Sequence, residues 1–145
     1  MTDGEFFTLR GYHLQEQRVL SDAMEDYLEM IYRQTRQQPT LRVNRLARLL
    51  NVRPPSASKM ASKLRDCGMV LSEPYGLLRL TPQGEELGAY LLHRHTVLHR
   101  LLCTINGTDQ ELSLAEKIEH HFDRRTIANI EAFLERVEGS TEPKP

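Results

Sequence analysis

The stretch AEKIEHHFD, near the C-terminal end, gathers side chains that could bind a metal ion. Glu116, Glu119 and His120 are spaced three and four positions apart, so a helix would project them from one face. His121 would be rotated about a third of a turn away. Carboxylates and imidazoles together are ligands for divalent cations. The same pattern is also typical of an exposed charged helix face, and Glu116 could instead form a capping box with Ser113.

Two other segments carry donors of the same kind. Asp26 and Glu29 lie three positions apart in MEDYLE, and a later segment carries His93, His95 and His99. Taken alone, each is typical of the polar flank of a helix. The three segments would make a metal site only if the fold brought them together.

Helices must hold these donors in place. Asp22, followed three residues later by Glu25, predicts a capping box at the start of a helix through AMEDYLEMIYRQT. Apolar residues recur in that segment at helical spacing, which predicts one buried stripe: Met24, Tyr27, Leu28 and Ile31.

The middle of the chain predicts a DNA-binding fold. LRVNRLARLLNVRPPSASKM contains two short helical patterns separated by NVRPP, and the second helix, about residues 54 to 67, ends at Gly68. Apolar runs at 69–72 and 77–80 flank EPYG and predict a β-hairpin. A helix-turn-helix followed by a hairpin is a winged helix.

Three more helices are predicted after the hairpin. Thr81 and Pro82 suit the N-cap and first position of a long helix that runs to about Ile105. QELSLAEKIEHHF predicts one further helix, and Asp123 caps a last one through RRTIANIEAFLERV.

Charge is segregated along the chain. The net charge is only −1, but residues 33 to 65 hold nine Arg or Lys and no acidic residue, which leaves −10 on the remainder. A basic block of this kind predicts a polyanion-binding face. Within it and the wing, we predict base-edge contacts from Ser56, Ala57 and Lys59, and phosphate contacts from Arg53, Ser58, Lys63 and Tyr75.

Together, the segments SDAMEDYLEMIY, PPSASKMASKL, YGLLRLTPQGEELG, RHTVL and EKIEHHF resemble the manganese-responsive regulators of the diphtheria toxin repressor family. The resemblance implies a site for two metal ions, with His121 as a non-ligand neighbour. The implied ligands are Asp26, Glu29, His95, Glu116, Glu119 and His120. Four carboxylates and two imidazoles without sulfur suit Mn²⁺, although other divalent metals could bind. Glu29 and Glu119 are candidates to bridge the two ions.

The resemblance also implies a mainly α fold, with an N-terminal winged helix-turn-helix and a small β-hairpin wing followed by an all-helical dimerisation domain. The predicted units are an N-terminal arm (1–20), the DNA-binding domain (21–81), the metal-binding and dimerisation domain (82–138) and a disordered tail (139–145).

The implied function is a homodimeric, Mn²⁺-activated repressor of metal-uptake and homeostasis genes, in which metal clamps the winged helix to the dimer core and tightens binding to a palindromic DNA operator. The isolated Cys67 and Cys103, with neither a signal peptide nor an apolar run of bilayer length, predict a cytoplasmic protein with no membrane partner.

Two alternatives remain open from the sequence. One is a winged-helix regulator that senses another metal or a small molecule. The other is a di-metal carboxylate enzyme, which we do not favour because such bundles use Glu-x-x-His and this chain contains none.

Overall fold

The computed structural model describes residues 20–139. Residues 1–19 and 140–145 lie outside that range, and with them all but one residue each of the predicted arm and tail. The elements in chain order are α2 (Asp22–Thr35), β1 (Leu41–Arg42), α3 (Val43–Leu49), α4 (Pro54–Asp66), β2 (Val70–Glu73), η1 (Pro74–Gly76), β3 (Leu77–Leu80), α5 (Pro82–Asn106), α6 (Leu112–Ile118), η2 (Glu119–His121) and α7 (Arg124–Gly139), where η marks a 3-10 turn.

Helix α2 carries two of the predicted ligands, and its cap lies one residue earlier than predicted. Ser21 is the N-cap, and its hydroxyl accepts a hydrogen bond from the backbone N–H of Met24 at 3.2 Å. The prediction of an Asp22–Glu25 capping box is therefore wrong. Both acidic residues lie instead in the first turn, where they complement the positive end of the helix dipole. The apolar stripe is confirmed, since all four of its residues are buried.

The winged helix follows in the predicted order. Gly68 ends α4 with a φ of +78°, a left-handed conformation that glycine adopts without a steric penalty. The hairpin strands β2 and β3 pair antiparallel, with Val70 opposite Leu80. A third strand, β1, pairs with β3 and puts Leu41 opposite Leu78. Strand β1 was not predicted, because two residues are too short to show a periodicity.

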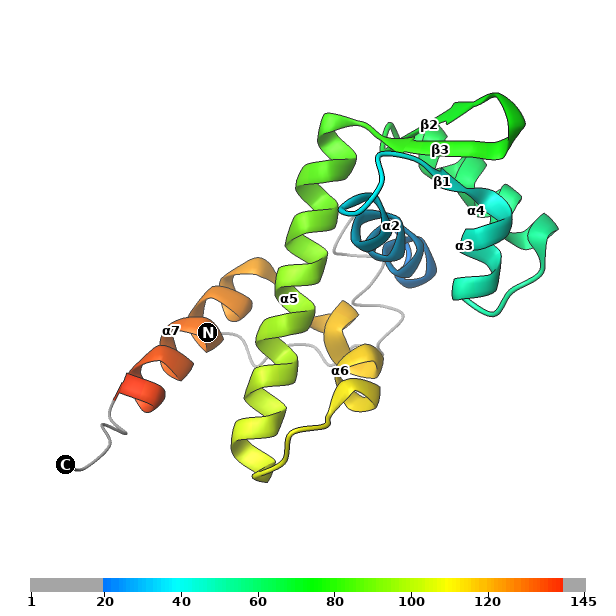
Figure 1. Cartoon of the computed structure of the whole chain (residues 1–145). Coiled ribbons are helices and arrows are strands. Elements are labelled where there is room, and N and C mark those ends of the chain that lie inside the picture. Colours follow the sequence, from blue (N-terminus) through cyan, green and yellow to red (C-terminus); the bar gives the residue numbers. More distant parts are fainter. Residues whose placement is uncertain (1–19, 140–145) are drawn as a thin grey trace, which may run out of the picture.

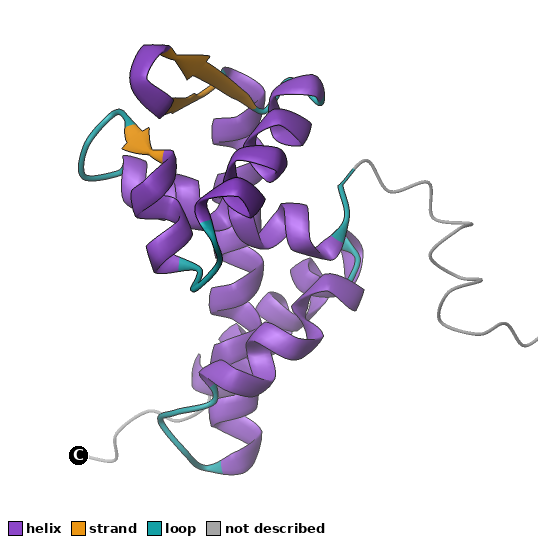
Figure 2. Ribbon diagram, turned by 90° about the vertical axis from the view of Figure 1, so that its right-hand side faces the viewer, coloured by secondary structure: helices purple, strands orange, loops and turns teal. Residues whose placement is uncertain are grey.

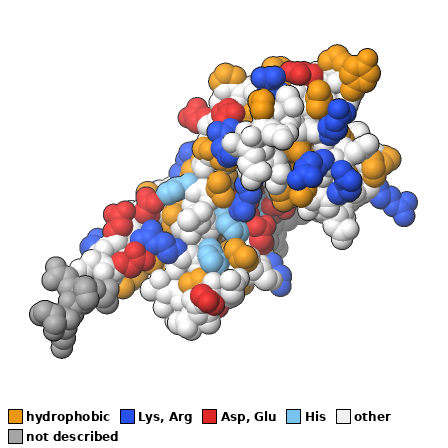
Figure 3. All heavy atoms as spheres, viewed as in Figure 1, with side chains coloured by type: hydrophobic (Ala, Val, Ile, Leu, Met, Phe, Trp, Pro, Cys, Tyr) orange, Lys and Arg blue, Asp and Glu red, His pale blue; other side chains and the backbone are white. Residues whose placement is uncertain are grey.

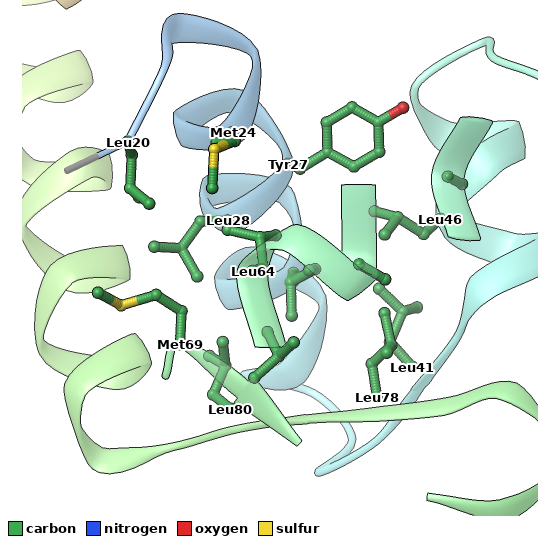
Figure 4. Packing of buried hydrophobic residues seen from close by; sticks show 14 of the residues in the cluster. Leu20, Met24, Tyr27, Leu28, Leu41, Leu46, Leu64, Met69, Leu78 and Leu80 are labelled. Carbon is green, nitrogen blue, oxygen red and sulfur yellow. The ribbon is translucent and has the colours of Figure 1, made fainter. Parts of the chain in front are cut away.

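One apolar core joins α2 to the winged helix (Figure 4). Leu28, Ile31, Leu46 and Leu64 are fully buried in it, and Leu91 of α5 belongs to the same cluster. Burying such a side chain contributes about 1.5–3 kcal/mol relative to leaving it exposed. The packing therefore makes α2, with its carboxylates, a rigid part of the DNA-binding unit.

Helix α5 connects this unit to the C-terminal helices (Figures 1 and 2). The Thr81 hydroxyl caps it by accepting from Gly84 N–H at 3.0 Å, as predicted, and donates to the Gly68 carbonyl at 2.6 Å. Glycines at 84 and 88 let α5 approach its neighbours closely. A Cβ on Gly88 would lie 2.7 Å from the Cβ of Tyr32 on α2.

The C-terminal region departs from the prediction at one point. The expected continuous helix over 110–122 is wrong, because α6 ends at Ile118 and η2 follows. The alternative interpretation of Glu116 as the partner of Ser113 in a capping box is also excluded, since the N-cap of α6 is Glu111. Asp123 does cap α7, accepting from Thr126 N–H at 2.7 Å. A second apolar cluster joins α5 to α7 through Val97, Leu98, Ile127 and Leu134.

The predicted fold class is confirmed: a winged helix-turn-helix with a small antiparallel sheet precedes an all-helical unit (Figure 2). Within residues 20–139, no helix combines the length and apolar character required to cross a bilayer.

Gly84 tests the close approach of α5 to the winged helix. A Cβ there would lie 2.0 Å from the backbone carbonyl oxygen of Met69, which cannot move without distorting β2. We expect Gly84→Ala to reduce the free energy of unfolding by at least about 2 kcal/mol in urea melts. Gly139→Ala is the control, because that glycine has open space around it. Equal stability of the two variants would contradict the packing.

Candidate metal centre

The six implied ligands converge from four elements. Asp26 and Glu29 come from α2, His95 from α5, Glu116 from α6, and the remaining two from η2. They form two groups, within each of which one donor atom per residue lies within 4.8 Å of the others. The first group is Glu29, His95, Glu116 and Glu119, and the second is Asp26, Glu119 and His120.

The first group surrounds the imidazole of His95. Its Nδ1 lies 2.7 Å from Oε2 of Glu119 and 3.4 Å from Oε1 of Glu116. His95, Glu119 and Glu29 are buried, whereas Glu116 is exposed at the rim. Three carboxylates around one imidazole make an oxygen-rich donor set, and its buried negative charge fits a divalent cation.

The second group is built around His120. Its Nε2 lies 2.9 Å from Oδ1 of Asp26 and 4.0 Å from Oε1 of Glu119. Glu119 therefore presents one oxygen to His95 and the other toward His120. This division depends on the 3-10 turn, because the break after Ile118 replaces the single α-helical face expected for 116, 119 and 120.

Burial and like charge shift the protonation of the first group. Burial and the neighbouring Glu119 raise the pKa of Glu29 to about 7, although Arg33 opposes the shift. Burial likewise raises the pKa of Glu116. The hydrogen bond to Glu119 raises the pKa of His95, against the effect of its own burial. In the absence of metal the group therefore retains protons near neutral pH.

His120 is shifted in the same direction. Burial opposes its charged form, but hydrogen bonds to Asp26 and Glu25 raise the pKa of His120 to about 10. A metal ligand must offer an unprotonated nitrogen, so binding at this group would release a proton.

Three charged residues beside the centre were missed as functional candidates. Glu25 was interpreted as a capping residue, yet its Oε1 lies 2.9 Å from Nδ1 of His120. Nη2 of the buried Arg94 lies 3.3 Å from the same Glu25 oxygen. Arg33 contacts Glu29 at 2.9 Å. Only the helical spacing of Arg33 from Glu29 was visible in the sequence, because the other two contacts join segments 69 and 95 residues apart.

The other histidines within residues 20–139 lie outside the two donor groups. His93 faces Glu131 of α7 at 3.0 Å. Nε2 of His99 accepts from Glu111 N–H at 3.2 Å and lies 3.5 Å from Sγ of Cys103. His121 is exposed and belongs to neither group of proposed ligands.

The predicted DNA-contacting residues lie on α4 or at its N-cap, except Tyr75, which lies on the wing. Arg53 at its N-cap and Ser56, Ser58, Lys59 and Lys63 along it are exposed. Ala57 is 0% exposed and packs in the core, so the prediction that it reaches a base edge is wrong. Tyr75, at the tip of the wing, is 90% exposed. Figure 3 shows Lys and Arg side chains gathered over the α3–α4 end.

A winged helix-turn-helix joined to helices that complete a carboxylate–imidazole centre defines a metal-responsive DNA-binding regulator. Residues 19–78 match the family model for the N-terminal DNA-binding domain of iron-dependent repressors. Residues 81–145 match the model for the metal-binding and dimerisation domain of the same repressors.

Named relatives agree with these models. The HTH-type transcriptional regulator MntR of Lysinibacillus sphaericus is 38% identical over 118 residues, covering 80% of this chain and 84% of that protein. The MntR of Bacillus subtilis is 36% identical over 118 residues, covering 80% and 82%. The chain belongs to the iron-dependent repressor family, also called the diphtheria toxin repressor family, and the resemblance noted in the sequence is confirmed.

Solved structures show the same fold. The manganese regulator SloR superposes with a TM-score of 0.67 at 24% identity, over 77% of this chain and 53% of that one. The apo form of the manganese-activated repressor ScaR gives 0.63 at 22% identity, over 75% and 53%. This chain therefore spans about half the length of those two proteins.

Membership of the family carries three properties: DNA binding, divalent metal binding and homodimerisation. The chain is a metal-dependent transcriptional repressor and not an enzyme, so the di-metal enzyme alternative no longer stands.

The pKa of Glu29 predicts a pH-dependent stability in metal-free protein. Its value of about 7 lies above the ordinary 4.5, so the native state binds this proton more tightly than the unfolded chain does. Native stability is therefore lost as pH rises from about 4.5 through 7. Glu29→Gln removes that loss, and we expect a gain on the order of 2 kcal/mol at pH 8 and little change at pH 4.5.

Urea melts at both pH values, with a chelator present, measure this difference. The exposed Glu86→Gln on α5 serves as the control. If Glu29→Gln changes the free energy of unfolding equally at pH 4.5 and pH 8, the ionised Glu29 carboxylate does not destabilise the native state.

Proposed function

We propose that this protein is a Mn²⁺-activated repressor of genes for manganese uptake and homeostasis, acting in the cytoplasm as a homodimer on a palindromic operator. The observation that carries the proposal is the pair of donor groups that meet at Glu119 and join α2 to α6 and η2. The names of the MntR relatives support the choice of metal.

The donor chemistry supports Mn²⁺ on independent grounds. The two groups offer four carboxylates and two imidazoles and include no sulfur ligand. Hard oxygen donors suit Mn²⁺, whereas thiolate or thioether would favour softer metals. Zn²⁺ and Cu²⁺ bind most sites more tightly, so selective activation must come from coordination geometry.

We propose two ions per subunit. One would be held by Glu29, His95, Glu116 and Glu119, and the other by Asp26, Glu119 and His120. Glu119 belongs to both groups, which supports its role as a bridging carboxylate. Glu29 belongs only to the first group, so we propose Glu119 alone of the two candidates as the bridging ligand.

The location of the donors explains how metal can control DNA binding. Asp26 and Glu29 are fixed to the winged helix because α2 packs in its core. Burial and, after it, the negative charge of Glu119 raise the pKa of Glu29, so like charges on α2 and η2 oppose one another. A divalent cation supplies the positive charge that stabilises their close approach, and it shifts the population only as far as it favours that arrangement.

The DNA-binding surface follows from the exposed residues of α4 and the wing. We propose base-edge contacts from Ser56 and Lys59, in the first turns of α4, and phosphate contacts from Arg53, Ser58, Lys63 and Tyr75. In a homodimer the two copies of α4 must lie about 34 Å apart, or a multiple of it, to enter successive major grooves. Setting this spacing is the proposed role of the metal.

Two adjacent histidines provide a matched test of the metal assignment. We expect Mn²⁺ to tighten wild-type binding roughly 5- to 150-fold, His120→Ala to lose most of that gain, and His121→Ala to keep it. Fluorescence anisotropy would measure this, using duplexes selected from a random-sequence pool with Mn²⁺-loaded protein. If wild-type affinity is the same with and without Mn²⁺, the proposed function fails. If Zn²⁺ activates but Mn²⁺ does not, the assigned metal is wrong.

The DNA-contact assignments predict two different effects. Lys63→Ala should weaken binding to all duplexes alike and lower the slope of log affinity against log salt by about 1. Lys59→Ala should in addition relax the preference at one operator position, at about 1–3 kcal/mol. Lys117→Ala, on α6, is the control, since this exposed lysine lies outside the basic block. If neither Lys59→Ala nor Lys63→Ala changes the slope of log affinity against log salt, α4 is not part of the DNA interface.

A further inference from the structure

Glu25 forms a contact that none of the proposed roles explains. Its carboxylate Oε1 lies 2.9 Å from Nδ1 of His120, on the side of the ring opposite the proposed metal-binding nitrogen. The Glu25 side chain is 12% exposed and that of His120 is 7% exposed, so water screens the contact only weakly. Glu25 also lies in the same turn of α2 as Asp26, which faces Nε2 of the same ring.

The contact gives Nδ1 of His120 a hydrogen-bond acceptor on the side of the ring away from the second donor group. Ionised carboxylates can only accept, and Nδ1 and Nε2 each lie 2.9 Å from one, Glu25 and Asp26 respectively, so the metal-free ring donates from both nitrogens. A metal ion at the second donor group would replace the hydrogen on Nε2, toward Asp26 and Glu119, while Nδ1–H keeps Glu25 as its acceptor. Arg94 Nη2 is also 3.4 Å from Nδ1, but an arginine can only donate, so the carboxylate of Glu25 is the acceptor for Nδ1–H.

A different role for Glu25 must be weighed, because Asp22, Glu25 and His120 also present donor atoms within 4.8 Å of one another. A metal there would use Nδ1 of His120. The guanidinium of Arg94 argues against it, since this permanent cation lies 3.3 Å from the Glu25 oxygen and 3.4 Å from Nδ1. A divalent cation held by both atoms would meet that charge at close range.

We propose that Glu25 is a positioning residue, which orients the His120 ring and holds its Nδ1–H so that Nε2 faces the second donor group. Arg94, buried at 4% exposure on α5, holds the Glu25 carboxylate in place and excludes a metal from that side. The inference rests on the proposed function, because it assigns a partner to a proposed ligand.

The arrangement joins three elements at one ring. Glu25 comes from α2, His120 from η2 and Arg94 from α5. One turn of α2 thus supplies both the proposed ligand Asp26 and the group that orients His120. Outer-sphere partners of this kind typically change metal affinity by 10- to 100-fold when removed.

The test compares Glu25→Ala, Glu25→Gln and the exposed control Glu86→Ala. Mn²⁺ binding is followed by electron paramagnetic resonance, which separates free from bound ions. We expect wild type and Glu86→Ala to bind two ions per subunit alike. In Glu25→Ala one of the two should bind 10- to 100-fold more weakly while the other stays within about threefold. Glu25→Gln keeps an oxygen acceptor for Nδ1–H and should recover much of the loss.

A second readout separates positioning from ligation. In ¹¹³Cd-loaded, ¹⁵N-labelled protein, coupling of cadmium to Nε2 of His120 and a proton on Nδ1 are expected. Coupling to Nδ1, or a loss in Glu25→Gln as large as that in Glu25→Ala, would make Glu25 a ligand and overturn the proposal. Wild-type affinity at both sites in Glu25→Ala would overturn it too.

Circular dichroism melts of the metal-free variants report folding separately. If Glu25→Ala is unfolded, Glu25→Gln and the cadmium spectrum of wild type still decide the question. Failure of wild type to bind Mn²⁺ at all would contradict the proposed function, whereas the cadmium spectrum would still test the role of Glu25.

Discussion

The structure depends on one buried carboxylate. Glu119 is 1% exposed, and it lies between the imidazoles of His95 and His120 at the point where three helical segments meet. Burying a charge is costly unless it is paired, so these segments must present cations or protons to it. The hydrogen bond from His95 partly meets that need. Burial first, and then the charge of Glu119, raises the pKa of the neighbouring Glu29, so the ionised carboxylates of the centre are not fully paired and a divalent cation can stabilise them.

The convergence on Glu119 requires a rigid frame. Helix α5 supplies it, because its first half belongs to the core of the winged helix through Leu91, while Val97 and Leu98 pack in the second cluster with α7. Gly88 permits the close contact with α2 that sets α2 beside His95 and Arg94. A change in how η2 meets α2 is therefore transmitted to the DNA-binding unit as a rigid body, since α2 cannot move without the core around Leu28.

Local signals predicted the elements well, and contacts distant in sequence decided the site. Thr81, Gly68 and Asp123 end or begin helices through their own backbone or side-chain chemistry, so their roles could be derived from neighbouring residues alone. The end of α6 at Ile118, the burial of Ala57 and the turn of Glu25 toward His120 could not. Each depends on what packs against that residue from another segment, which a periodicity does not contain.

The charge distribution connects the two halves of the molecule. The acid-free block from residue 33 to 65 holds the basic surface of α3 and α4, whereas the carboxylates of the two donor groups lie on α2, α6 and η2. Arg33 stands at the boundary, at the beginning of the basic block, and its contact with Glu29 ties the two regions together. Because Arg33 lowers the pKa of Glu29 against burial, it already provides part of the positive charge that the centre requires. A cation added at the first donor group would therefore compete with Arg33 for the same carboxylate, so the C-terminal half of α2 links this donor group electrostatically to the basic block.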